Sequence, residues 1–310
     1  MPDPIAQAAL TVEATYKARE TEGFLDLHFY RPIGFWLAQF FAKLKMTPAN
    51  VSLFGGVTGV IAGHLYFYRD LRVNVIGMLL HVSANALDNA DGQLARLTNT
   101  RSLEGRIIDS LADHFVFASI YIHLVLRYLI AGATPLVCLL AVAAAISHAL
   151  QGAAADYYRN AYLYFLNSRS SADWDSSADV RPVYRTLSWR HQPWRKFLLM
   201  LYFNFTRQQE ILSPCLKRLQ ETANRSFTQE IPNSIRVPYQ ISARPMFKWW
   251  SLLMTNTRMF VLFVLLFIGR PIFYFWIELT ALNVLLVFLI VRQEKVAQTL
   301  METAAEREPA

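Results

Sequence analysis

Six apolar stretches dominate the chain, and each is long enough, or nearly so, to cross a lipid bilayer as a helix. They cover residues 50–68, 71–90, 107–130, 133–156, 252–269 and 271–292. Only Arg69 and Asp70 separate the first pair, and only Arg270 and Pro271 mark the boundary in the last pair, so both pairs are expected to form tight helical hairpins. The pattern therefore predicts an all-α integral membrane protein with six transmembrane helices.

A basic and aromatic-rich insertion separates the fourth apolar stretch from the fifth. The predicted segments are 1–46 (N-terminus and an amphipathic helix), 47–165 (transmembrane helices one to four), 166–248 (the insertion) and 249–310 (helices five and six with a polar tail). Within the insertion, residues 168–179 are typical of a flexible loop. Residues 194–212 are expected to form a partly apolar helix that lies on the membrane.

Residues 31–46 combine apolar and basic positions in a way that suits an interfacial helix. The apolar positions are Trp36, Leu37, Phe40, Phe41 and Leu44, and the basic ones are Arg31, Lys43 and Lys45. Basic side chains at an interface can meet anionic lipid, which favours this interpretation. The alternative is an ordinary helix packed on the bundle.

Composition supports a membrane location. Hydrophobic residues make up 54% of the 310 residues, and the mean hydropathy of +0.24 is too high for an ordinary soluble domain. The net charge of +7 could indicate nucleic acid, but the apolar stretches favour membrane lipid as the partner and no nucleic acid. Lys and Arg are concentrated in 157–249, so both termini and the insertion are predicted to be cytoplasmic, in the cell (inner) membrane. Residues 1–23 carry no secretory signal, so the first span is expected to direct insertion, and Cys138 and Cys215 are expected to be free thiols.

Four aspartates lie where the second apolar stretch ends and the third begins. On a helix, Asp88 and Asp91 share a face with Ala95, and the i, i+4 spacing of Asp109 and Asp113 gives them a common face too. A short turn joins the two helices. The four carboxylates are therefore predicted to converge at the cytoplasmic end of the bundle.

Such a cluster needs a counter-charge. One carboxylate inside a membrane helix costs about 2.5–3.5 kcal/mol, and neighbouring carboxylates repel one another. A divalent cation removes both costs, and an all-oxygen ligand set favours Mg²⁺, Mn²⁺ or Ca²⁺ over Zn²⁺. Gly92 and Gly105 lack a Cβ and would let a bulky ligand approach, and Arg96 could meet a phosphate. Solvated loop charges are the alternative, which four aspartates at this spacing argue against.

The pattern D-x2-D-G-x2-A-R-x8-G-x3-D-x3-D from Asp88 to Asp113 resembles the signature of the CDP-alcohol phosphotransferase family. Six spans, with the motif bridging the second and third, also fit that family, whereas the insertion does not. The stretch from Thr47 to Ser52 (TPANVS) resembles the family's entry to the first span. Asn50 is accordingly either a contributor to the CDP site or a plain N-cap.

The resemblance implies a role for each matching residue. Asp88, Asp91 and Asp109 would bind metal, and Asp113 would complete a site for two Mg²⁺ or Mn²⁺ ions and act as the general base, with His114 as the alternative base. The CDP pocket would comprise Gly92, Ala95, Arg96, Gly105 and Asn50. The acceptor oxygen would attack the β-phosphorus of a CDP-lipid and CMP would leave. By analogy a homodimer is expected.

The acceptor is less well defined by the sequence. Arg159 and His148 share a stripe of the fourth span and are candidate acceptor-binding residues, and Arg207 and Arg258 are weaker ones. The predicted reaction is phosphatidyl transfer from CDP-diacylglycerol, first to a polyol phosphate such as inositol phosphate or glycerol phosphate. Serine as acceptor and an aminoalcohol phosphotransferase are the alternatives within the family. A membrane prenyltransferase would need two distant aspartate motifs and about nine spans, and a transporter would spread its acids over several spans.

Overall fold

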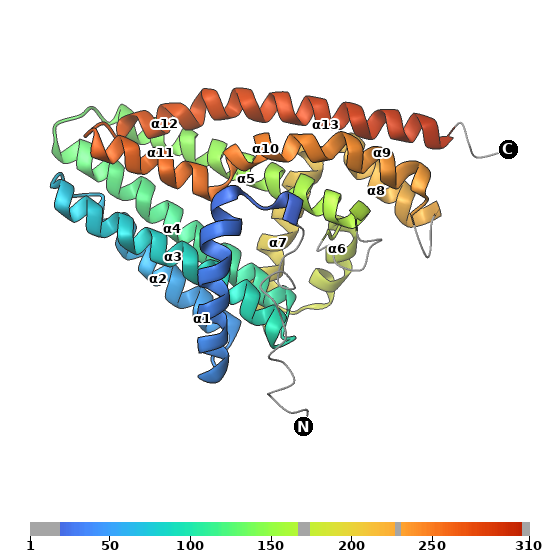
Figure 1. Cartoon of the computed structure of the whole chain (residues 1–310), viewed down its shortest axis with the longest axis horizontal. Coiled ribbons are helices and arrows are strands. Elements are labelled where there is room, and N and C mark those ends of the chain that lie inside the picture. The colour runs from blue at the N-terminus through green and yellow to red at the C-terminus, as the bar shows by residue number, and fades with distance from the viewer. Residues whose placement is uncertain (1–18, 167–173, 227–230, 306–310) are drawn as a thin grey trace. The chain divides into compact units, whose positions relative to one another are not determined.

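The computed structural model describes residues 19–166, 174–226 and 231–305, and within these ranges it is helical and contains no β-strand (Figure 1). The predicted all-α class is therefore confirmed. The chain folds into two compact units. The first comprises Met1–Ala141 and Leu262–Ile272, and the second comprises Val142–Val261 and Phe273–Ala310.

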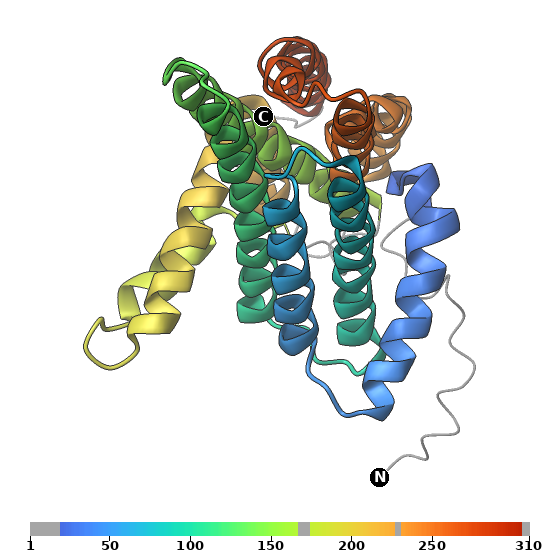
Figure 2. The same cartoon turned by 90° about the vertical axis from the view of Figure 1, so that its left-hand side faces the viewer.

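The first unit is built on four helices, preceded by the short turns η2 (Arg19–Thr21) and η3 (Asp26–Tyr30). They are α1 (Arg31–Lys43), α2 (Pro48–Leu65), α3 (Leu71–Leu97) and α4 (Leu103–Ile130). Helix α2 packs against both α3 and α4, and α1 packs along α3 (Figure 2). The position of α3 relative to α4 is thus determined by α2.

Glycines of α2 make this close packing possible. A Cβ added at Gly59 would lie 2.5 Å from Cγ2 of Val116, and one added at Gly63 would lie 2.8 Å from the backbone nitrogen of Ile120. Small residues at such spacing let membrane helices approach closely. Gly55 plays the same part toward α3, where an added Cβ would lie 3.2 Å from Cβ of Leu87.

Short turns join these helices, as the sequence indicates. The Asp70 side chain caps α3 by accepting a hydrogen bond of 2.8 Å from the backbone nitrogen of Arg72. Between α3 and α4, Asn99 adopts a left-handed conformation with φ of 52°. Ser102 then caps α4, its Oγ accepting a bond of 3.0 Å from the nitrogen of Gly105.

Helix α1 covers most of the stretch 31–46, where an interfacial helix is expected, and it packs on α3 as a bundle helix does. Its inner face carries Ala38 and Phe41, while Trp36 and Phe40 are exposed and stack at 6.2 Å. The expectation that Arg31 faces lipid is wrong, because its side chain is buried and forms an ion pair of 2.5 Å with Glu22. An interfacial location of α1 stays a prediction.

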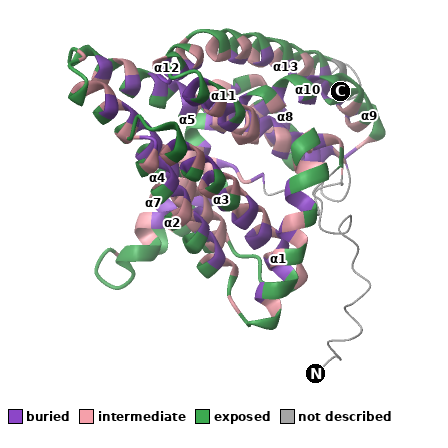
Figure 3. Cartoon of the chain, turned by 60° about the vertical axis from the view of Figure 1, so that its left-hand side comes forward, coloured by how far each residue is buried: buried purple, intermediate pink, exposed green. Residues whose placement is uncertain are grey.

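Four helical stretches among the described residues are long and apolar enough to cross a membrane. They are Leu103–Ile130, Leu136–Leu166, Asn233–Phe267 and Ile272–Glu302. The first two predicted spans form α2 and α3 but are not among the four. The polar inward positions of α3, such as Asn74 and His81, account for its lower apolarity. Figure 3 colours exposed positions on α2 and α4 green. The exposed apolar side chains of these helices include Phe54, Ile61 and Phe115.

The second unit contains the later part of α5 and most of the remaining helices. They are α5 (Leu136–Leu166), α6 (Ser177–Thr186), α7 (Pro193–Leu212), α8 (Pro214–Ser226), α9 (Asn233–Ala243), η4 (Arg244–Met246), α10 (Phe247–Trp250), η5 (Ser251–Leu253), α11 (Thr255–Phe267), α12 (Ile272–Leu279) and α13 (Ala281–Ala305). Helices α8 and α9 pack along α13.

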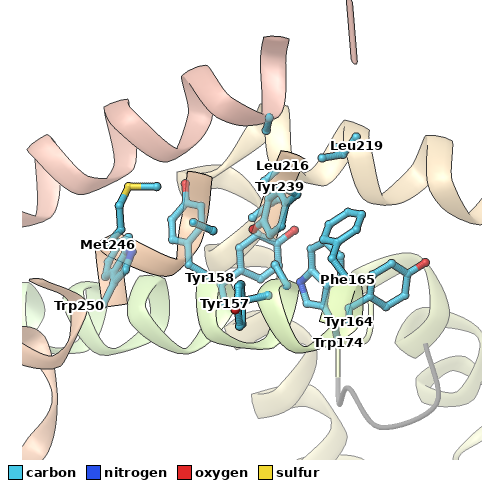
Figure 4. Close-up of a cluster of buried hydrophobic side chains, with 14 of the residues drawn as sticks. Tyr157, Tyr158, Tyr164, Phe165, Trp174, Leu216, Leu219, Tyr239, Met246 and Trp250 are labelled. Atoms are coloured by element: carbon cyan, nitrogen blue, oxygen red, sulfur yellow. The ribbon is translucent and has the colours of Figure 1, made fainter. Parts of the chain in front are cut away.

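An aromatic core holds the insertion to the spans of this unit (Figure 4). Tyr158 of α5 stacks on Trp250 at 4.9 Å, and Phe165 lies 4.4 Å from Tyr239 of α9. Glu294 of α13 accepts a hydrogen bond of 2.6 Å from the backbone nitrogen of Cys215, at the start of α8. The insertion therefore shares its core with the spans of this unit.

Both cysteines are free thiols, as expected. Burial, together with the nearby carboxylate of Glu294, raises the pKa of the Cys215 thiol. This thiol is therefore protonated at neutral pH, which suits a packing role.

The predicted loop at 168–179 is only partly correct. Residues 168–173 lie outside the described ranges, but Ser177 already begins α6. Ser176 and Asp179 form a capping box there, in which each side chain bonds the backbone nitrogen of the other. The helix expected at 194–212 is confirmed as α7.

Candidate active site

The end of α3 and the start of α4 bring the aspartates together. Carboxylate oxygens of Asp88, Asp91 and Asp109 all lie within 4.8 Å of one another. Asp113, one turn further along α4, interacts electrostatically with each of these three. Asp91 is buried and the others are half-buried. Three of the four residues singled out by the spacing therefore form one cluster between α3 and α4.

Ser52 is a site residue that the sequence analysis missed. Its hydroxyl donates a hydrogen bond to the carboxylate of Asp91, across from α2 to α3. Its Oγ also lies 3.1 Å from the carbonyl oxygen of Pro48, an alternative acceptor on its own helix. The first turns of α2 thus orient one of the clustered carboxylates. The signal was present, since Ser52 is the last residue of the TPANVS stretch.

Arg31 is a second missed neighbour of the cluster. It interacts electrostatically with Asp88, although its guanidinium is also paired with Glu22. The carbonyl oxygen of Arg31 accepts a bond of 3.1 Å from the side chain of Gln93 on α3. This hydrogen bond holds the start of α1 next to the aspartates. The guanidinium of Arg31, whose charge is partly neutralised by Glu22, therefore lies near them.

The backbone at Gly92 faces open space. A Cβ added there would meet nothing nearer than the guanidinium of Arg96, at 3.8 Å. Packing within the protein therefore does not require glycine at this position, in contrast to Gly59 and Gly63. Ala95 and Arg96 follow on the same helix and are half-buried. At Gly105 an added Cβ would lie 3.0 Å from Oγ of Ser102, so its freedom to accept a side chain is smaller.

Asn50 lies in the first turn of α2 with an exposed side chain. The helix cap is Thr47, whose Oγ1 accepts a bond of 3.3 Å from the backbone nitrogen of Asn50. The interpretation of Asn50 as an N-cap is therefore wrong. Its place two residues before Ser52 keeps it a candidate for the CDP site.

The two histidines considered near the motif have other partners. His114 is exposed, and its Nδ1 bonds the carbonyl oxygen of Ser110 one turn back on α4, at 2.5 Å. His81 is buried, with Nδ1 at 3.2 Å from the hydroxyl of Tyr66. The contact of His81 suits a packing role, and the choice of Asp113 over His114 as the base stays a prediction.

The candidate acceptor residues belong to the second unit. Arg159 pairs with Asp156 on its own helix at 2.7 Å. Nδ1 of the buried His148 lies 3.5 Å from the carboxylate of Glu278, which is also 3.2 Å from Nε of Arg258. Both candidates thus have an acidic neighbour already, and their role toward an acceptor stays a prediction.

The cluster suits a hard divalent cation. Three carboxylates within 4.8 Å of one another offer only oxygen donors, which Mg²⁺, Mn²⁺ and Ca²⁺ prefer. Such close carboxylates repel one another, and a bound cation relieves that repulsion. Asp88, Asp91 and Asp109 would hold it, with Asp113 next to them.

Comparison with known proteins agrees with this geometry. No curated protein sequence matches the chain. The family model of the CDP-alcohol phosphatidyltransferases matches residues 45–162, which include α2, α3, α4 and most of α5. Members of this family transfer a phosphatidyl group to an alcohol in the membrane and generally depend on divalent metal. The aspartate pattern from Asp88 to Asp113 lies within the matched residues, and the matching family is the one that this pattern resembles.

Proposed function

We propose that the protein transfers the phosphatidyl group of CDP-diacylglycerol to a hydroxyl acceptor and releases CMP. The observation that carries the proposal is the cluster of Asp88, Asp91 and Asp109 from α3 and α4, next in the chain to the open backbone of Gly92. The first acceptor candidate is a polyol phosphate, such as inositol phosphate or glycerol phosphate. Six spans, a cytoplasmic site in the cell membrane and a homodimer complete the proposal.

The residues of the site have separate roles in the displacement of CMP by the acceptor hydroxyl. Gly92, Ala95, Arg96, Gly105 and Asn50 bind the CDP moiety, with the guanidinium of Arg96 toward phosphate. Two Mg²⁺ or Mn²⁺ ions held by the aspartates would neutralise charge on the diphosphate. Asp113 accepts the proton of the acceptor hydroxyl while that oxygen forms its bond to the β-phosphorus. The bond from this phosphorus to the oxygen of CMP breaks, and CMP leaves with the electron pair.

Release of CMP tests the reaction directly. Purified protein in detergent with Mg²⁺ and CDP-diacylglycerol is offered inositol phosphate, glycerol phosphate or serine, one at a time. We expect CMP with one of the two polyol phosphates. Turnover with CDP-ethanolamine and diacylglycerol, and none with CDP-diacylglycerol, would instead make the protein an aminoalcohol phosphotransferase.

Ser52→Ala should weaken metal binding while the fold persists. The lost hydroxyl no longer orients Asp91, and removing such an outer partner typically costs about 10–100-fold in metal affinity. Binding of Mn²⁺, followed by electron paramagnetic resonance, measures the change. Ser83→Ala is the matched control, because the Ser83 hydroxyl bonds the carbonyl oxygen of Leu79 on its own helix. Equal Mn²⁺ affinity in the two variants would remove Ser52 from the site.

Gly92→Ala should fold normally and bind the CDP-lipid more weakly. Among the described residues outside its own helix turn, the added methyl meets no atom nearer than 3.8 Å, so a clash is expected with a bound ligand. Gly152→Ala is the control, since a Cβ at Gly152 on α5 meets nothing within 4 Å. Neither variant should lower the melting temperature, because alanine is preferred to glycine inside a helix, and only Gly92→Ala should raise the KM for CDP-diacylglycerol. An unchanged KM would show that the substrate does not approach this backbone.

A further inference from the structure

Residues 180–209, which include most of α6, the connecting turn and most of α7, form a strongly basic segment that we call the basic hairpin. It contains no Asp or Glu, and its six Lys and Arg residues are Arg181, Arg185, Arg190, Arg195, Lys196 and Arg207. Acidic residues lie only at its two ends, at Asp179 and Glu210. Such an excess of one sign of charge attracts a polyanionic partner.

Aromatic side chains are exposed at the tip of the basic hairpin. Trp189 and Trp194 are 50% and 58% exposed. Lys196 folds back on the tip, where its Nζ donates a bond of 2.7 Å to the carbonyl oxygen of Leu187 and lies 4.9 Å from the ring of Tyr184. The tip is therefore an ordered structure that presents arginines and indole rings together.

The C-terminal end of the basic hairpin is hydrogen-bonded to a candidate membrane span. The side chain of Gln209 donates a bond of 3.0 Å to the carbonyl oxygen of Ala153 on α5, within the span Leu136–Leu166. Both views in Figures 1 and 2 show α7 running across the direction of α5. If α5 follows the membrane normal, α7 then extends along the bilayer surface, over about 30 Å for 20 residues.

We infer that the basic hairpin binds anionic phospholipid headgroups at the bilayer surface beside α5. Arginines are drawn to the negative surface potential of an anionic leaflet, and tryptophan prefers the interface between lipid and water. A polynucleotide would also suit the charge and the rings. The bond between Gln209 and α5 favours lipid, because it brings the hairpin to a membrane surface.

A fluorophore at the tip tests this inference in the whole protein. His191→Cys, made with Cys138→Ser and Cys215→Ser, accepts an environment-sensitive label at an exposed position. The labelled protein is placed in nanodiscs of phosphatidylcholine alone or of phosphatidylcholine with phosphatidylglycerol, with brominated acyl chains as quencher. We expect a blue-shifted and more strongly quenched emission with phosphatidylglycerol, and a loss of this difference at high salt.

Charge variants distinguish lipid binding by the basic hairpin from a general attraction of the basic protein surface to anionic lipid. Adding Arg185→Gln and Arg190→Gln should raise the fraction of phosphatidylglycerol needed for half-maximal quenching several-fold. The control pair, Arg218→Gln and Lys295→Gln, removes the same charge from exposed positions on α8 and α13 and should leave that fraction unchanged. The inference fails if quenching is the same in both nanodiscs or if the two pairs behave alike. A larger shift on adding single-stranded RNA to phosphatidylcholine nanodiscs would overturn it in favour of a polynucleotide partner.

Discussion

Asp113→Asn should lower the rate of CMP release by about 10²–10⁴-fold, the usual contribution of a general base. The amide keeps the size of the side chain but cannot take up the proton of the acceptor hydroxyl. Asp88, Asp91 and Asp109 keep their cluster in this variant. We therefore expect CDP-diacylglycerol to bind with nearly the affinity of the parent, so that kcat falls much more than KM changes.

Asp70→Asn is the matched control for this experiment. It makes the same substitution at the N-cap of α3, at the end of that helix far from Asp88 and Asp91. Asparagine caps a helix about as well as aspartate does, so the fold should be unaffected. Its rate should equal that of the parent. An active Asp113→Asn variant would show that another group takes the proton, and His114→Gln would then be the next variant to measure.

Asp109→Asn should remove Mn²⁺ binding and CMP release together. Asp109 is one of three carboxylates within 4.8 Å of one another, and an amide oxygen is a much weaker ligand than a carboxylate. The loss of Mn²⁺ affinity should exceed the roughly 10–100-fold expected for an outer partner such as Ser52. Electron paramagnetic resonance of added Mn²⁺ measures the binding without reference to activity.

Chelation provides an independent version of the same test. Removing metal from the parent protein should stop CMP release, and adding back Mg²⁺ or Mn²⁺ should restore it. Asp70→Asn should bind Mn²⁺ as the parent does. A chelated parent that keeps its full rate, or an Asp109→Asn variant with parental Mn²⁺ affinity, would contradict the assignment of the aspartates as metal ligands.

The aspartate cluster could be predicted because it depends on helical geometry alone. Asp88 with Asp91, and Asp109 with Asp113, have spacings that give each pair one helix face, and a turn of a few residues brings the two helices together. Ser52 and Arg31 could not be found in this way. Their roles depend on how α2 and α1 pack against α3, which a pattern within one helix does not reveal.

The insertion was the least predictable part of the fold. Its polar and serine-rich beginning is typical of a loop, yet α6 starts at Ser177. The local capping box of Ser176 and Asp179 is reinforced there by Glu210 on α7, whose side chain accepts hydrogen bonds from the nitrogen and hydroxyl of Ser177, at 2.7 Å each. The start of α8 similarly depends on Glu294, 79 residues further along the chain from Cys215. Such long-range caps override the local preference of the sequence.

Binding of CDP-diacylglycerol with and without metal tests the central claim most directly, namely that the segment from Asp88 to Asp113 holds both metal and the CDP-linked substrate. Isothermal titration of the lipid into purified protein in detergent gives its affinity with Mn²⁺ and with chelator. The account predicts clear binding with Mn²⁺ that is lost on chelation and in Asp109→Asn. Equal affinity with and without metal would contradict it.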